Sequence, residues 1–128
     1  MIFRSSVGGL IGLFLSMLFQ CAVAHHSTAM FEPTKQIVLE GSIKEFRFTN
    51  PHSWIYLIVK NDRGEDVVWE IEGASVSQMA RQGWTYKSLQ VGEKVKVTIA
   101  PRVDGTPGGA FRGVEKSDGT VLGTSPRV

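Results

Sequence analysis

The chain has 128 residues, a formal net charge of +2 and one cysteine. Its charges are nearly balanced and interspersed, which excludes the basic stripe of a nucleic-acid-binding protein and argues against attachment to an anionic membrane surface. No internal repeat or low-complexity tract divides the chain, so we expect a single domain.

The first 24 residues predict an export signal. Arg4 is the only charge among them, and the apolar run 10–19 has the length of a signal-peptide core. A membrane span needs about 20 apolar residues, so the run is short for that role. Ala22 and Ala24 form the small-x-small pattern of a cleavage site. We therefore predict cleavage after Ala24 and a periplasmic address.

Two alternatives to cleavage remain open. Residues 1–24 could stay as an anchor, or a lipid could be attached to Cys21, although Gln20 is not the small residue that lipid attachment favours. Cleavage would remove the only cysteine, so the mature chain could form no disulfide and would depend on its core. We expect an N-terminal arm over 25–35, a single β domain over 36–123 and a disordered tail over 124–128.

The first predicted strand is long and changes phase. Residues 37–43 alternate between apolar and polar types, but Phe46 and Phe48 continue on the opposite phase. Because a shift of one residue turns every side chain over, this change predicts a bulge or bend near Lys44. A long, bent first strand suits a small barrel.

A proline turn and a hairpin follow. Asn50-Pro51-His52 interrupts the pattern, since proline has no N–H to donate and restricts the residue before it. Residues 53–60 and 66–72 are rich in aromatic and β-branched types and predict two strands, and 61–64 predicts the turn that joins them.

A short helix is predicted next, with Ser75 as its N-cap and Gly83 just beyond its C-terminus. Trp84 is expected to anchor this helix to the end of the barrel. The remaining predicted elements, in chain order, are a strand over 94–100, a loop over 101–109, a strand over 110–115 and a closing segment over 120–122.

The order of elements predicts the fold class. Three strands, a short helix and two further strands match an all-β domain of the OB type, a five-stranded Greek-key barrel with one helix between its third and fourth strands. An antiparallel β-sandwich or meander with one helix is the alternative. Neither architecture determines a function by itself.

The three histidines are the candidate metal ligands. After cleavage at Ala24, His25 would offer its free amine and its ring, while His26 and His52 could supply further nitrogen ligands. Copper(II) favours nitrogen ligands in a tetragonal plane. We therefore consider a copper-like ion as a candidate cofactor. The alternative is that His25 and His26 are only a solvated terminus.

The turn and the next strand suggest a second kind of site. Asn50 and Trp54 flank His52, and aromatic residues beside a histidine at a barrel rim form a candidate ligand-binding spot. Ordinary turn chemistry and core filling explain the same residues. Glu70 and Glu72 share one strand face and could form a cation site or an acid–base pair, but solvated carboxylates are common on such faces.

Several motifs resemble those of a group of small exported proteobacterial proteins of unknown function. These motifs are the His25-His26-Ser27 start, the run 39–46, the turn Asn50-Pro51-His52 with Trp54, the run 69–72 and the segments Gly83-Trp84 and 91–95. The resemblance covers nearly all of the chain after residue 24. It implies a periplasmic address and a single small β domain, directs attention to His25, His26, Asn50 and His52, and implies no activity.

Two binding functions follow from these residues. In the first, a periplasmic module holds a copper-like ion through His25, His26 and His52. In the second, a metal-free barrel binds a small molecule, a peptide or an exported protein through an aromatic rim near Trp54. An enzyme ranks third, because no nucleophile–base set can be assembled from the sequence. Neither nucleic acid nor a membrane span in the processed chain is expected.

Overall fold

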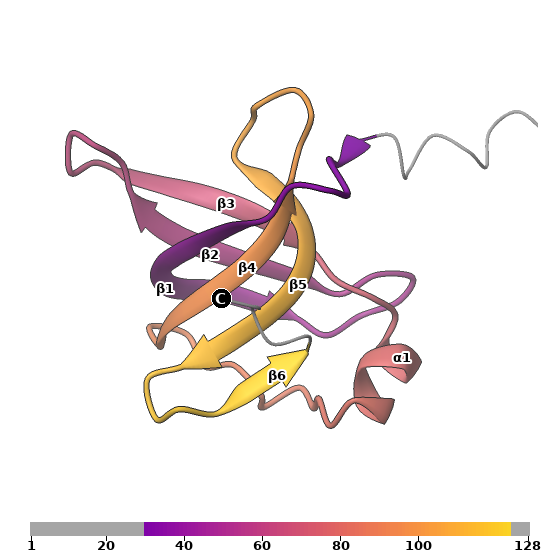
Figure 1. The fold of residues 1–128 in the computed structure, drawn as a ribbon. Coiled ribbons are helices and arrows are strands. Elements are labelled where there is room, and N and C mark those ends of the chain that lie inside the picture. The colour runs from indigo at the N-terminus through magenta and orange to yellow at the C-terminus, as the bar shows by residue number, and fades with distance from the viewer. Residues whose placement is uncertain (1–29, 124–128) are drawn as a thin grey trace, which may run out of the picture.

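The computed structural model describes residues 30–123, and the predicted signal peptide, His25, His26 and the predicted tail lie outside this range. The described chain forms six strands and one helix (Figure 1). They are β1 (Ile37–Arg47), β2 (Trp54–Lys60), β3 (Asp66–Glu72), α1 (Val76–Arg81), β4 (Lys94–Pro101), β5 (Gly108–Lys116) and β6 (Val121–Gly123).

The strands close into a five-stranded barrel. The sheet order is β3-β2-β1-β4-β5-β6, and an additional parallel pairing joins β3 to β5. β1 to β5 therefore form a closed ring, and β6 adds a short sixth strand to β5. With α1 between β3 and β4, this is the predicted OB-type architecture, and the sandwich or meander alternative is wrong.

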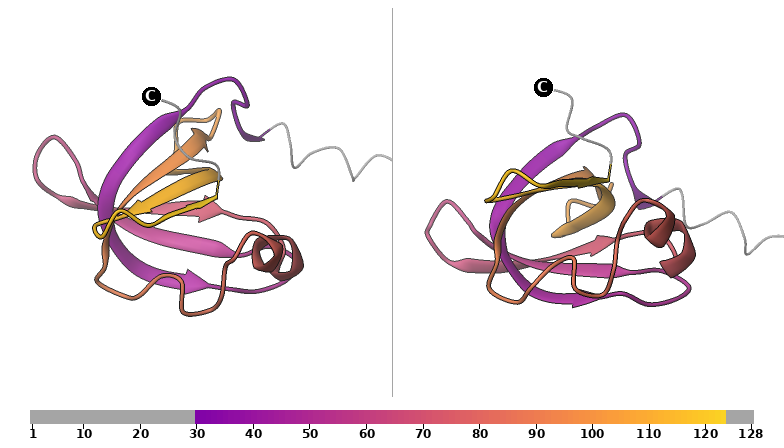
Figure 2. Two further views of the ribbon diagram at one scale, coloured as in Figure 1. Left: turned by 60° about the horizontal axis from the view of Figure 1, so that its bottom comes forward. Right: turned by 90° about the horizontal axis from the view of Figure 1, so that it is seen from below.

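β1 belongs to both halves of the barrel. Its first half pairs with β4 and its second half with β2, and the β1–β2 register shifts between Ile43 and Glu45. This irregularity confirms the bulge predicted from the change of phase. Figure 2 shows β1 as an arc that wraps around the barrel. At Gly41 the arc lies so close to β2 that a Cβ would collide with the carbonyl oxygen of Ile58.

The core fills the barrel and closes one end. Trp84, 2% exposed, contacts Phe46 and Phe111 at ring-centroid distances of 5.7 and 5.4 Å. The prediction that Trp84 anchors the helix region to the barrel is confirmed, since the helix residue Met79 joins the same cluster. The buried hydrophobic side chains are Leu39, Ile43, Ile55, Leu57, Ile71, Met79, Trp84, Leu89, Val95, Val97, Ile99, Ala100 and Val114.

The helix has the predicted ends. The Ser75 side chain accepts a hydrogen bond from the backbone N–H of Gln78, and Gly83 has a φ of +91°. A helix of this length is marginal alone, so burial of Met79 against the barrel stabilises it.

The loop predicted over 101–109 is shorter in the structure. Pro101 is the last residue of β4, while Gly108 and Gly109 begin β5. Proline is tolerated at a strand end, and a Cβ at Gly109 would collide with the carbonyl oxygen of Ala100. These glycines permit close strand packing here, whereas the sequence pattern predicted a loop.

Candidate functional site

His52 lies against the end of β3. Its Nδ1 forms a hydrogen bond with Oε1 of Glu72. An ionised carboxylate can only accept, so Nδ1 carries the proton and donates it. The His52 side chain is 47% exposed and that of Glu72 is 21% exposed. Nε2 is therefore the ring nitrogen that remains for a ligand.

The β1–β2 loop holds His52 through its backbone. Thr49 Oγ1 donates a hydrogen bond to the carbonyl oxygen of His52 at 3.0 Å. The backbone N–H of the buried Ser53 donates to the carbonyl oxygen of Ala74 at 2.9 Å. The Asn50–Pro51 peptide bond within this loop is cis. His52 is thus held on both sides rather than carried on an extended loop.

Asn50 has a structural partner. Its Oδ1 accepts a hydrogen bond from the backbone N–H of Val76 at 3.0 Å, at the start of α1. The first N–H groups of a helix lack partners within the helix, so Asn50 satisfies one of them and ties the loop to the helix. This contact explains the residue without a ligand, and the predicted ligand contact stays a prediction.

Glu70 and Glu72 lie on the same face of β3, as predicted, but each has its own hydrogen-bond partner. Glu72 contacts His52, while Glu70 Oε2 accepts a hydrogen bond from Arg102 Nη2 at 3.0 Å. Arg102 is only 18% exposed in its side chain. Among residues 30–123, no group of three or more His, Cys, Asp or Glu residues could hold a metal ion. We call His52, Glu72, Glu70 and Arg102 together the histidine end.

Two residues beside the histidine end were missed by the sequence analysis. Arg47 places its guanidinium carbon 4.9 Å from the ring centroid of Tyr56 and donates a hydrogen bond to the Tyr56 hydroxyl at 3.2 Å. Arg47 also donates to Glu45 at 2.6 Å, and this hydrogen bond lowers the pKa of the Glu45 carboxyl. The period of two along β2 could have indicated that Tyr56 shares a face with Trp54.

Trp54 is half-buried and lies opposite Arg47 on β1 and Glu72 on β3. With Tyr56 it forms an outward-facing aromatic pair on β2. Trp54 is two residues from His52 in the sequence and lies opposite Glu72, the partner of His52, in the sheet.

The chain enters the barrel at the histidine end. The backbone N–H of Val103 donates to the carbonyl oxygen of Met30 at 2.9 Å, and Phe31 forms a β-bridge with Arg102. Arg102 contacts Glu70, which is two residues from the histidine partner Glu72. A short series of contacts therefore connects the last part of the predicted arm to His52, while His25 and His26 lie outside the described residues.

Fold and site together define a small OB-type barrel with a polar and aromatic face next to its β1–β2 and β4–β5 loops. Residues 14–111 match the family described as "Family of unknown function (DUF6152)". The chain belongs to this family. No curated protein matches it.

A solved structure with a similar fold is the mitochondrial single-stranded DNA binding protein Rim1 of S. cerevisiae. It is 16% identical and has a TM-score of 0.41, and the similarity covers 71% of this chain and 88% of Rim1. A similarity this remote does not bear on the ligand of the present protein. Within residues 30–123, no helix is long and apolar enough to cross a membrane.

Proposed function

We propose that this protein is an exported, periplasmic binding protein that holds a copper-like transition-metal ion through His52 and the N-terminal histidines. The observation that carries the proposal is the contact between His52 and Glu72. Histidines that bind metals commonly donate their second ring N–H to a carboxylate, which fixes the tautomer and the orientation of the ring. Glu72 does this for His52 before any metal is bound.

The missing ligands would come from the N-terminal arm. His25 would supply its amine and its ring after cleavage, and His26 a further imidazole. Five residues, 25–29, precede Met30, and an extended chain spans roughly 3.3 Å per residue. The contacts of Met30 and Phe31 with the β4–β5 loop support an approach from the side of the histidine end. We therefore expect His25 and His52 to share one ion.

Calorimetric titration of the processed protein with Cu(II) tests this proposal. The double variant His25→Ala, His52→Ala should lose most of the affinity, and an affinity equal to that of the unaltered protein would overturn the proposal. Glu72→Gln should weaken binding by about tenfold or more, because a carboxylate that hydrogen-bonds a metal-ligating histidine typically contributes that much. Glu70→Gln is the matched control, since this neighbouring carboxylate contacts Arg102 instead of His52.

The periplasmic address has its own test. The intact mass of the protein recovered from the periplasm should correspond to residues 25–128. A mass that retains residues 1–24, or one that carries a lipid on Cys21, would remove the free amine of His25 and with it the proposed chelate.

A second candidate function rests on the outward aromatic pair. Trp54 and Tyr56 lie on a face bordered by Arg47 and Glu72, and such faces can bind a small molecule, a peptide or an exported protein without metal. This function predicts a shift of tryptophan emission on addition of the ligand and none with metal. The shift should disappear in Trp54→Phe, whereas the buried Trp84 should contribute little.

A further inference from the structure

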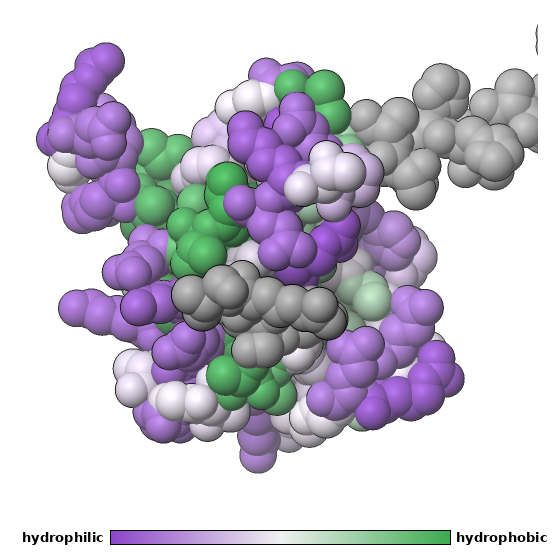
Figure 3. Space-filling model, viewed as in Figure 1, coloured by the Kyte–Doolittle hydropathy of each residue, from purple (hydrophilic) through white to green (hydrophobic). Residues whose placement is uncertain are grey.

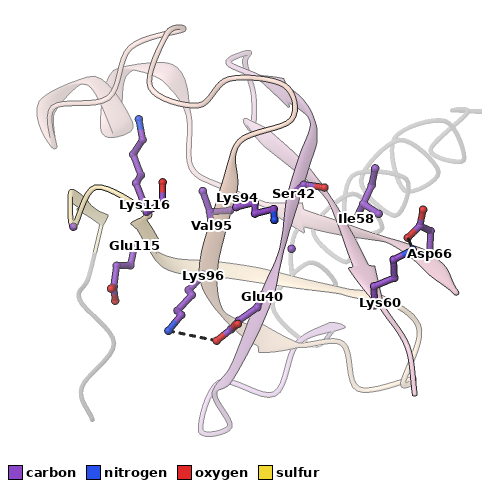
Figure 4. Close-up of a pocket in the computed structure, with 13 residues that line it drawn as sticks. Glu40, Ser42, Ile58, Lys60, Asp66, Lys94, Val95, Lys96, Glu115 and Lys116 are labelled. Carbon is purple, nitrogen blue, oxygen red and sulfur yellow. Dashed lines mark ion pairs between the residues drawn. The ribbon is translucent and has the colours of Figure 1, made fainter. Parts of the chain in front are cut away.

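The opposite end of β2 borders a groove that the proposed metal site does not use. The groove has a volume of about 810 Å³, which is within the usual range for small-ligand pockets. Residues of β1, β2, β4 and β5 line most of it, together with Asp66 at the start of β3 (Figure 4). Four lysines and three carboxylates line it, and we call it the lysine groove; they are Lys60, Lys94, Lys96, Lys116, Glu40, Asp66 and Glu115.

The shape of the groove depends on Gly41. This residue lies on β1 in the groove wall, and the carbonyl oxygen of Ile58 occupies the place that its Cβ would need. The absence of a side chain lets β1 and β2 approach closely under the groove. Ile58, half-buried, supplies an apolar part of the lining. On the face seen in Figure 3, apolar patches lie among more hydrophilic regions.

Most charges in the groove already have partners within it or beside it. Lys96 contacts Glu40 at 3.4 Å, and Lys60 contacts Asp66 at 2.5 Å. Both pairs are more than half exposed, so each contributes about 1 kcal/mol at most and a ligand could replace it. Lys116 is different: its ammonium donates to the carbonyl oxygen of Ser88 and contacts Glu93, and only 19% of its side chain is exposed.

Two further charged side chains of the groove, one cation and one anion, differ from these pairs. Within residues 30–123, the exposed side chains of Lys94 and Glu115 have no hydrogen bond or ion pair. Lys94 on β4 lies opposite Ser42 on β1 and extends towards it (Figure 4). Glu115 on β5 lies opposite Lys96 on β4. Both open charges therefore border the same groove, Lys94 on β4 and Glu115 on β5, with Lys96 opposite Glu115 and two residues from Lys94.

We propose that the lysine groove binds a short peptide with a free amine and a free carboxylate, its carboxylate at Lys94 and its amine at Glu115. Charge complementarity selects this ligand class, because three carboxylates in the lining oppose a purely anionic ligand and four lysines oppose a purely cationic one. The half-buried Ile58 suits an apolar peptide side chain. The groove volume of about 810 Å³ is sufficient for a ligand of this size.

The test is an NMR titration of the complete processed protein with leucyl-leucine. Backbone amides of groove residues, Ser42 and Lys94 among them, should shift, while amides of the histidine end should not. N-acetyl-leucyl-leucine, which lacks the amine, and leucyl-leucine amide, which lacks the carboxylate, should each bind up to about fivefold more weakly, the upper limit for loss of one exposed charge pair.

Two variants assign the ends of the peptide. Lys94→Gln should remove the advantage of leucyl-leucine over its amide, and Glu115→Gln should remove its advantage over the N-acetyl form. Lys35→Gln, which alters an exposed lysine outside the groove, is the control and should change neither ratio. Equal binding of all three peptides, tighter binding of the N-acetyl form, or shifts confined to the histidine end would each overturn the proposal.

Discussion

The histidine end and the lysine groove lie at opposite ends of β2 and differ in how their charged side chains are partnered. At the histidine end each carboxylate of β3 has its own partner, His52 for Glu72 and Arg102 for Glu70. In the lysine groove Lys94 and Glu115 have no such partner within residues 30–123. In the first region the contacts therefore hold both carboxylates of β3 in place. In the second, Lys94 and Glu115 remain available to a ligand.

The largest expected effect on stability comes from comparing one glycine of each region, Gly41 in the lysine groove and Gly73 near the histidine end. Gly41→Ala should lower the free energy of unfolding by about 2–3 kcal/mol, because the new methyl group would press on the backbone of β2. Gly73→Ala, near the histidine end, is the control: its Cβ would have neighbours at 3.4 Å, an ordinary contact. Urea denaturation of both variants measures the difference, and equal stability would show that the groove does not need Gly41.

Arg102→Ala should cost about 1–2 kcal/mol of stability, because it removes a largely buried side chain and leaves Glu70 without its partner. Arg63→Ala, at the exposed tip of the β2–β3 hairpin, should have little effect. Thermal unfolding compares the two. If both variants melt alike, the paired charges of the histidine end do not hold it together.

Asn50→Ala should lower stability by about 1 kcal/mol, the usual contribution of a side chain that satisfies a helix N-terminus. The loss would come from the unpaired N–H of Val76. Chemical denaturation measures it, with the exposed Gln36→Ala as reference. An unchanged midpoint would mean that water replaces Asn50 at the N–H of Val76 at no cost in stability.

The smallest effect concerns pH. The hydrogen bond from Arg47 lowers the pKa of Glu45, so the folded protein binds this proton less readily than the unfolded chain. The contribution of Glu45 is therefore present above its unfolded pKa and is lost as the pH falls through its folded pKa. Carbon NMR of the Glu45 carboxyl should show a titration below the ordinary range, and Arg47→Gln should move it back. An identical titration in both proteins would contradict the pairing.

Local signals in the sequence were enough for the order of elements. The change of phase after Ile43 revealed the bulge of β1, and Ser75 and Gly83 marked the ends of α1. Each of these features depends on neighbours within a few residues. The sequence pattern was wrong where a residue type occurs in both loops and strands. Gly109 was predicted to lie in a loop, but it lies in β5.

The partners within the site could not be found in the same way. Asn50 and Val76 are 26 residues apart, and Glu70 and Arg102 are 32 residues apart. The parallel β3–β5 pairing brings the β4–β5 loop beside Glu70, whereas the contact of Asn50 depends on the β1–β2 loop lying against the start of α1. The sequence identified His52 as a candidate ligand, but its carboxylate partner required the closed barrel.

The double membership of β1 also bears on how quickly the protein folds. The hairpin of β2 and β3 can form from neighbouring residues, but Ile37 must meet Ile99, and β3 must meet β5, before the ring is complete. Topologies dominated by such distant pairings fold in roughly milliseconds to seconds, far slower than small helical bundles. Until that pairing forms, the side chains of β1 that face the core lack their neighbours on β4.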